Sequence, residues 1–195
     1  GSIKAFNLDN VKVYPGENNK YALCINDVYS NSFHNMNGSL LNGDILLTDA
    51  NGAGFDNTAD IKADADIVVA SKGDVNLRGN LSMINKLELQ QVVKLTFKGA
   101  NLGNMQINAN VPATRIIFES DTIAANAKIV AKSKDIRVTV PKSLVGNLKF
   151  ITDGGEFVSV DEKNKEVSSS VTDGPAVNIN AVNKPVAGGI QATLE

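Results

Sequence analysis

The chain of 195 residues is long enough to form one domain with a substantial core, and its 43% hydrophobic content excludes bulk disorder. Its net charge is −2 with both signs scattered, so the composition gives no support to nucleic-acid binding. A single cysteine excludes an intramolecular disulfide and a cysteine-based metal site, and no apolar run reaches the length of a membrane span.

The first sixty residues predict irregular strands and loops that cap a stack. Residues 3–30 contain alternating apolar residues typical of two or three strands, whereas residues 31–60 are rich in Asn, Gly, Asp and Ser. Within them, residues 52–60 (GAGFDNTAD) predict an exposed loop. The leading Gly1-Ser2 resembles the remnant of a removed tag, so we expect a native export signal to have preceded it.

A pattern recurs about every twenty residues between residues 61 and 152. The runs VNLRGNL (75–81) and LTFKGANL (95–102) place Leu77 and Phe97 in register, and IIFESDTI (116–123) followed by IRVTVPKSL (136–144) places Phe118 in register with Val138. A second set of strands lies about ten residues away from the first: LELQQV (87–92), MQINANV (105–111), KIVAK (128–132) and LKFIT (148–152). A repeat of this period indicates units that stack and bury a continuous core.

We therefore predict an all-β fold, a single-domain β-solenoid in which each coil holds two short strands. A β-sandwich, which also shows short strands at regular spacing, is the alternative. The 24 asparagines suit a fold with many corners, because Asn tolerates left-handed backbone and bonds to its own backbone in turns.

The C-terminal segment, residues 153–195, predicts a cap on the last coil. It contains one strand, EFVSV (156–160), then a charged, Ser-rich hairpin or loop at 161–175. The alternating segments AVNINAV (176–182) and GGIQATL (188–194) follow. A cap is expected because an uncovered terminal coil leaves a hydrophobic face and an edge able to pair.

Candidate catalytic residues are few. His34 is the only histidine and lies in a loop-like context, and Cys24 lies between two apolar residues, where a small buried thiol is expected. The glycine-rich GAGF (52–55) matches neither a phosphate loop nor a dinucleotide fingerprint, and no serine-nucleophile elbow occurs. We therefore predict no catalytic residue and no enzymatic activity.

An oxygen-rich stretch between residues 49 and 66 raises calcium binding as a possibility. It contains Asp49, Asp56, Asp60, Asp64 and Asp66, interleaved with Asn51 and Asn57. Such side chains can bind Ca²⁺, but the spacing matches neither an EF-hand loop nor a calcium-binding nonapeptide. Surface acid is the preferred interpretation, and no metal or cofactor is predicted.

Basic residues recur through the repeat, at Arg78, Lys98, Arg115, Lys132 and Arg137. The preferred interpretation is solvated outward positions on strands, and an anion-binding ladder is the alternative. If a sheet face binds a partner, the row that we predict consists of six outward residues: Asn76, Arg78, Thr96, Lys98, Arg137 and Thr139.

Three phrases of similar pattern follow one another from about residue 61: ADIVVASKGDVNLRGNL (65–81), QQVVKLTFKGANLGNMQINAN (90–110) and AKIVAKSKDIRVTVPKSLVGNLKFITDGGEFVSV (127–160). Through these phrases the region from about residue 61 to the C-terminus resembles the bacterial adhesin family whose members are also called toast-rack or head domains. Lys-Gly and Arg-Gly stand here where Ser-Gly or Thr-Gly steps are usual in that family. The resemblance implies a β-solenoid on the bacterial cell surface or at the membrane periphery, with no catalytic residues to transfer.

These observations predict a non-enzymatic, adhesin-like binding or scaffold domain exposed at the cell envelope, on the periplasmic or extracellular side. Its expected partner is a protein or polysaccharide, not nucleic acid. The alternatives are a self-assembling, bactofilin-like structural solenoid and the sensing or docking domain of a membrane envelope-stress protein. A carbohydrate-active β-helix enzyme is disfavoured, because aromatic residues are only 5% of the chain.

Overall fold

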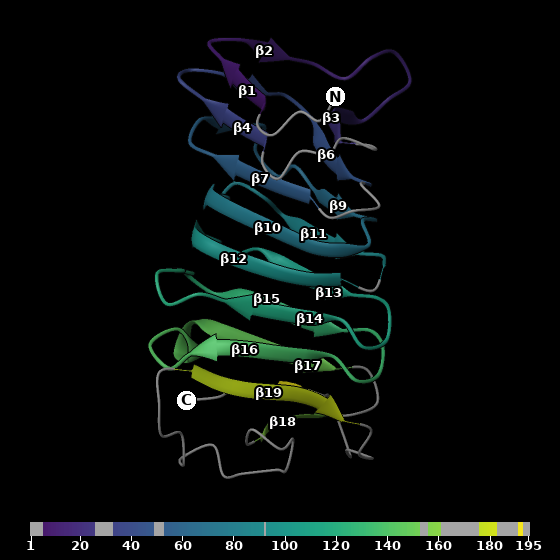
Figure 1. The fold of residues 1–195 in the computed structure, drawn as a ribbon, viewed down its shortest axis with the longest axis vertical. Coiled ribbons are helices and arrows are strands. Elements are labelled where there is room, and N and C mark those ends of the chain that lie inside the picture. Colours follow the sequence, from purple (N-terminus) through teal and green to yellow (C-terminus); the bar gives the residue numbers. More distant parts are fainter. Residues whose placement is uncertain are drawn as a thin grey trace.

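The computed structural model describes residues 6–25, 33–48, 53–91, 93–152, 156–160, 176–182 and 191–192. Within these residues the protein is an all-β solenoid, in which successive coils stack along one long axis (Figure 1). Parallel pairing joins each coil to the next, so the predicted fold class is confirmed. The helical content of the described residues is one short 3-10 turn, η1 (Val145–Asn147).

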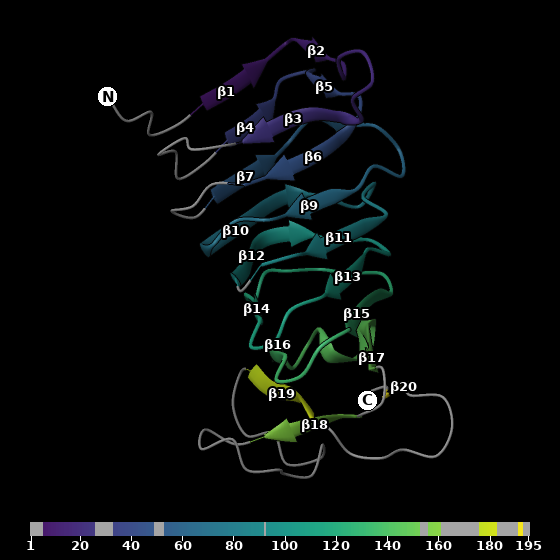
Figure 2. The ribbon, with the colours of Figure 1, turned by 90° about the vertical axis from the view of Figure 1, so that its right-hand side faces the viewer.

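Two large sheets and one small sheet form the sides of the solenoid (Figures 1 and 2). The nine-stranded sheet of the described residues contains, in spatial order, β1 (Phe6–Asp9), β4 (Phe33–Met36), β7 (Ala53–Asn57), β10 (Gly73–Asn80), β12 (Val93–Asn101), β14 (Arg115–Phe118), β16 (Arg137–Pro141), β19 (Ala176–Val182) and β18 (Glu156–Val160). The eight-stranded sheet contains β20 (Gln191–Ala192), β17 (Leu148–Thr152), β15 (Ala127–Ala131), β13 (Gln106–Ala109), β11 (Lys86–Leu89), β9 (Ile67–Val69), β6 (Asp44–Leu47) and β3 (Tyr21–Ile25). The small sheet contains β2 (Lys12–Val13), β5 (Leu40–Leu41) and β8 (Asp60–Ile61).

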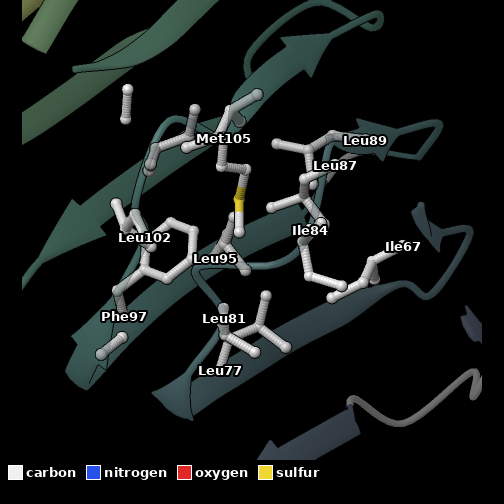
Figure 3. Packing of buried hydrophobic residues seen from close by; sticks show 14 of the residues in the cluster. Ile67, Leu77, Leu81, Ile84, Leu87, Leu89, Leu95, Phe97, Leu102 and Met105 are labelled. Atoms are coloured by element: carbon white, nitrogen blue, oxygen red, sulfur yellow. The ribbon is translucent and has the colours of Figure 1, made fainter. Parts of the chain in front are cut away.

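The core lies between the two large sheets and is filled by alternate residues of every coil. In β10, Val75 and Leu77 are fully buried, while Asp74 and Arg78 face solvent. Figure 3 shows how Leu77, Leu95 and Phe97 from one sheet meet Leu87, Leu89 and Met105 from the other side of the coil. Because each side chain in a strand points opposite to the next, the period-two pattern of the sequence fixes which residues enter this core.

Aromatic rings stack along the solenoid axis at one inward position. Phe6 lies on Phe33 with a centroid distance of 5.0 Å, Phe33 on Phe55 at 6.4 Å, and Phe97 on Phe118 at 5.1 Å with an interplanar angle of 5°. Leu77 occupies the same register position between Phe55 and Phe97. These residues form the aromatic ladder: Phe6, Phe33, Phe55, Leu77, Phe97 and Phe118.

The register confirms one predicted alignment and corrects another. Leu77 is paired with Phe97, as the repeat predicts. Val138, however, is paired with Ile116 and not with Phe118, so that prediction was wrong by two residues. The corner segments between successive coils differ in length, and a two-residue shift returns a side chain to the same face, so the hydrophobic pattern alone does not detect it.

The N-terminal residues belong to the stack itself. β1 pairs with β4 and β4 with β7, all parallel, and the three short strands β2, β5 and β8 add a third side to these first coils. A boundary at residue 60 therefore does not separate irregular structure from regular coils. Residues 52–60 were wrongly predicted as an exposed loop: β7 and β8 lie here, and Phe55 is 1% exposed.

The last coil is covered by antiparallel strands. β19 pairs with β16, and β20 pairs with β17, both antiparallel, whereas the preceding coils pair in parallel. β18, the predicted EFVSV strand, pairs with β19 at the outside of the sheet. The predicted hairpin or loop at 161–175 lies outside the described residues.

Buried asparagines bridge neighbouring coils at one corner. Asn35 and Asn57 are both fully buried, and Asn35 Nδ2 donates to Asn57 Oδ1 at 2.8 Å. Asn57 Nδ2 in turn donates to the carbonyl oxygens of Asn80 at 2.7 Å and Ala59 at 2.8 Å. The corner backbone cannot complete its own ladder, so the amide side chain supplies the missing partners.

Replacing Asn57 with alanine should destabilise the fold by about 2–3 kcal/mol, because the buried Asn35 Nδ2 loses its acceptor and the part-buried carbonyl oxygens of Ala59 and Asn80 lose their donor. Asn104→Ala, at an exposed turn position, is the matched control and should change stability by less than about 0.5 kcal/mol. Chemical denaturation of both variants measures the difference. Equal losses in the two would show that the Asn57 side chain does not hold this corner.

Candidate functional site

All six residues of the predicted row lie on strands of the nine-stranded sheet, but Thr96 is buried there and not exposed as predicted. Strand pairing places Asn76 beside Thr96, and Arg78 beside Lys98. Thr139 follows in the first of these columns, beyond Ile117, because Thr96 pairs with Ile117 and Ile117 with Thr139. Arg137 does not continue the column of Arg78 and Lys98; its partner is Arg115, so the row is divided among three neighbouring columns.

The column that contains Arg78 and Lys98 is electrically compensated, and we call it the mixed column: His34, Asp56, Arg78, Lys98 and Glu119. His34 Nδ1 lies 3.4 Å from Asp56 Oδ2, and Lys98 Nζ lies 3.8 Å from Glu119 Oε1. Arg78 lies in register between Asp56 and Lys98. Each of the two adjacent cations therefore has an acidic neighbour on its other side, Asp56 for Arg78 and Glu119 for Lys98, which reduces the attraction of this column for an external anion.

A second column carries charges of one sign, and we call it the basic column: Lys94, Arg115 and Arg137. Lys94 pairs with Arg115, and Arg115 with Arg137, on consecutive strands of one sheet. Lys94 and Arg115 are exposed and form no ion pair within the part of the chain that the structure describes. Arg137 Nε donates to Asp135 Oδ1 at 3.1 Å, on a side chain that is itself exposed.

Cations in register on neighbouring strands repel one another. The coils repeat at the interstrand distance of about 4.8 Å, so three like charges stand in a line along the solenoid axis. The repulsion between two neighbouring cations in water costs up to about 1 kcal/mol. The fold tolerates this cost, and the repulsion contributes nothing to its stability. A line of cations at a fixed spacing, of which Lys94 and Arg115 form no ion pair among the described residues, is suited to an extended chain that carries anionic groups at intervals.

The charge of the chain changes sign along the solenoid. Residues 33–91 contain four Lys or Arg and eight Asp or Glu, whereas residues 93–152 contain nine and three, which gives net charges of −4 and +6. The overall charge of −2 conceals this division. The basic column therefore lies in the positive half, where the surrounding potential reinforces it.

The two candidate catalytic residues lie on different sheets. His34 is half-buried in β4 beside Asp56, and Cys24 is in β3 on the eight-stranded sheet. Cys24 is exposed, which corrects the prediction of a small buried thiol. Ile25, its neighbour, points into the core, so the alternation of β3 places the sulfur of Cys24 outside.

The acidic residues of the calcium hypothesis are spread around the coil. Asp56 lies on the nine-stranded sheet, Asp60 on the small sheet, and Asp66 at the edge of the eight-stranded sheet, where its Oδ1 accepts from the Lys86 backbone N–H at 3.1 Å. Asp64 occupies a turn with φ of 60°, and Asp49 lies outside the described residues. Among the described residues, no three His, Cys, Asp or Glu side chains gather in a group able to hold a metal ion.

No protein-family model, curated protein or solved structure matches this chain. A helix long and apolar enough to cross a membrane does not occur in the described ranges. The fold and the surface therefore carry the functional argument.

Lys94 is the residue of the basic column that the sequence repeat did not single out. The signal was present, because each of these cations comes directly before a buried apolar residue of its strand: Lys94 before Leu95, Arg115 before Ile116 and Arg137 before Val138. Aligning the coils on Phe118 and Val138 displaced this position by two residues and hid the column.

Proposed function

We propose that this protein is a non-enzymatic binding or scaffold domain that presents the outer face of its nine-stranded sheet to an extended anionic polysaccharide. The observation that supports the proposal most directly is the basic column, which places Lys94, Arg115 and Arg137 in register on consecutive strands. A rigid stack keeps such groups at a constant spacing. A polymer with repeated anionic groups can therefore contact several of them at once, and the protein does not lose conformational entropy on binding.

The neighbouring side chains favour a polysaccharide over a nucleic acid. Beside the basic column, the adjacent column contains the half-buried Asn76, whose amide group can bond to sugar hydroxyls, followed by the buried Thr96, then Ile117 and Thr139. The aromatic ladder points inward, and rings on which bases would stack are lacking on this face among the described residues of β10, β12, β14 and β16.

A pair of double variants with equal charge changes tests the site. Lys94→Ala with Arg115→Ala removes two charges from the basic column, and Arg78→Ala with Lys98→Ala removes two from the mixed column. We expect the first to weaken binding of dextran sulfate about tenfold or more at low salt, and the second about threefold or less. Isothermal titration calorimetry measures both, with uncharged dextran as the ligand control.

Three outcomes contradict the proposal. Equal weakening by the two double variants would indicate a response to net charge and not to a site. Tighter binding to a single-stranded oligonucleotide of similar charge would indicate a nucleic-acid surface. If the protein bound neither dextran sulfate nor the oligonucleotide, a polyanion would be excluded as its ligand. The stability of the Lys94→Ala, Arg115→Ala variant should not fall, because both residues stand beside like charges.

The proposal places the domain on the outer side of a bacterial envelope, as a surface or periplasmic protein. Support comes from the resemblance of residues 61–195 to the adhesin family described above, and from the suitability of a stacked β-sheet face for polymer contact. The native reading frame tests this location. We expect an export signal upstream, and a reading frame without such a signal would contradict the envelope location and indicate a cytoplasmic scaffold.

A further inference from the structure

The two ends of the solenoid are built differently. At the C-terminal end, β19 and β20 pair antiparallel with the last coil, and β18 lies beyond β19. At the other end, β1, β2 and β3 are the terminal strands of their three sheets, and no described strand lies beyond them (Figure 2). An edge of this kind offers unpaired N–H and C=O groups to another strand.

The open end also holds most of the large hydrophobic side chains that are exposed among the residues whose burial the structure describes. Large hydrophobic side chains are exposed at four described positions, and three of them are in the first coil: Phe6 at 44%, Val11 at 41% and Tyr14 at 60%. Phe6 begins the aromatic ladder, with one ring face stacked on Phe33. Among the described residues the ladder begins at Phe6, whose ring therefore stays partly exposed.

The first strand has limited edge protection. Edge strands are commonly kept short or blocked by charged side chains, lysine above all, or by proline. β1 (FNLD) has four residues and one charge, Asp9, and it contains neither lysine nor proline, whereas the segment through β2 carries Lys12 and Pro15. The charges of residues 6–25 are balanced, because Asp9 and Glu17 offset Lys12 and Lys20. Two copies of this end can therefore approach without the net repulsion that two basic or two acidic halves would produce.

From these observations we propose that the first coil is an interface with a second copy of this chain, in which β1 pairs antiparallel with β1 of the other copy. A two-fold axis across the end of the stack brings the two β1 edges together and reverses their directions. The interface is then the same patch on both copies, with the Phe6 rings buried at its centre. Because antiparallel strands cover the opposite end, the assembly closes at two copies and does not extend into a filament.

Sedimentation velocity of the 195-residue chain over a range of concentrations, without any polymer, tests this interface independently of the proposed function. We expect a monomer–dimer equilibrium with no larger species. The double variant Phe6→Asp, Val11→Asp should be monomeric at every concentration, because it places like charges in the interface. Ile123→Asp, which changes a hydrophobic residue exposed to 59% outside the first coil, is the control and should dimerise as the parent does.

A spin label on the exposed Cys24 gives a second measurement, because the chain contains one cysteine and it lies in the end coil. Dimerisation through the first coil brings two labels together, so a dipolar coupling is expected that disappears in the Phe6→Asp, Val11→Asp variant. A chain that stays monomeric, species larger than a dimer, or a dimer without coupling between the labels would each overturn the proposed interface.

Discussion

Replacing Gly79 with alanine is expected to destabilise the solenoid by about 3 kcal/mol or more. Gly79 has a φ of 80°, a conformation that costs an L-residue free energy whatever surrounds it. A Cβ at this position would also overlap the carbonyl oxygen of Asn57 in the neighbouring coil. Neither the strained backbone nor the buried corner can move without disturbing the hydrogen bonds of Asn57.

Gly146→Ala is the matched control, because a Cβ there meets no heavy atom within 4 Å apart from its chain neighbours. This substitution should change stability by less than about 1 kcal/mol, in either direction. Urea denaturation followed by circular dichroism compares the two variants. If Gly79→Ala unfolds at the same urea concentration as the control, the close approach of Gly79 to Asn57 does not constrain the stack.

Phe97→Ala should cost about 3–5 kcal/mol, since it leaves a large cavity in the middle of the aromatic ladder. Phe97 is fully buried, and its ring is nearly parallel to that of Phe118. Phe97→Leu should cost less than about 1.5 kcal/mol, because leucine already occupies this ladder position at Leu77.

The same denaturation experiment distinguishes the contribution of volume from that of ring stacking. A leucine variant that is nearly as stable as the parent would show that filling the space is the main requirement. A loss for Phe97→Leu as large as that for Phe97→Ala would contradict this, and would show that the parallel rings, not the buried volume, hold adjacent coils in register.

The repeat in the sequence was sufficient to predict coils and to identify most of their inward residues. Val75, Leu77, Leu95 and Phe97 are buried as the alternation requires. The period-two rule works here because a solenoid strand has a solvent face and a core face throughout. The same rule cannot distinguish registers that differ by two residues, which is why Val138 was aligned with Phe118.

Residues 52–60 show a second limit of predicting structure from the sequence alone. Their Gly, Asp and Asn content is typical of a loop, and only Phe55 indicates a strand. The structural role of Asn57 depends on Asn35 and on the Asn80 backbone, which are 22 and 23 residues away. No local propensity reports such a contact, because the adjacent coil supplies the partner.

The candidate site could be predicted only in part for the same reason. The alternation predicts the outward positions: Arg78 is exposed and Asn76 and Lys98 are half-buried on one face, whereas Thr96 in the same row is buried. Whether a cation stands beside an anion or beside another cation depends on the register of neighbouring coils. That register separates the compensated pair of Lys98 and Glu119 from the uncompensated pair of Lys94 and Arg115.

The pairing of coil upon coil also determines how the molecule would respond to tension. The hydrogen bonds between coils run along the long axis, so a force that separates the two ends loads them one coil at a time and not all together. Detaching one coil of about 22 residues would release roughly 70 Å of extended chain. Under tension between its ends the protein would therefore lengthen in steps, each the size of one coil, while the remaining coils keep their core.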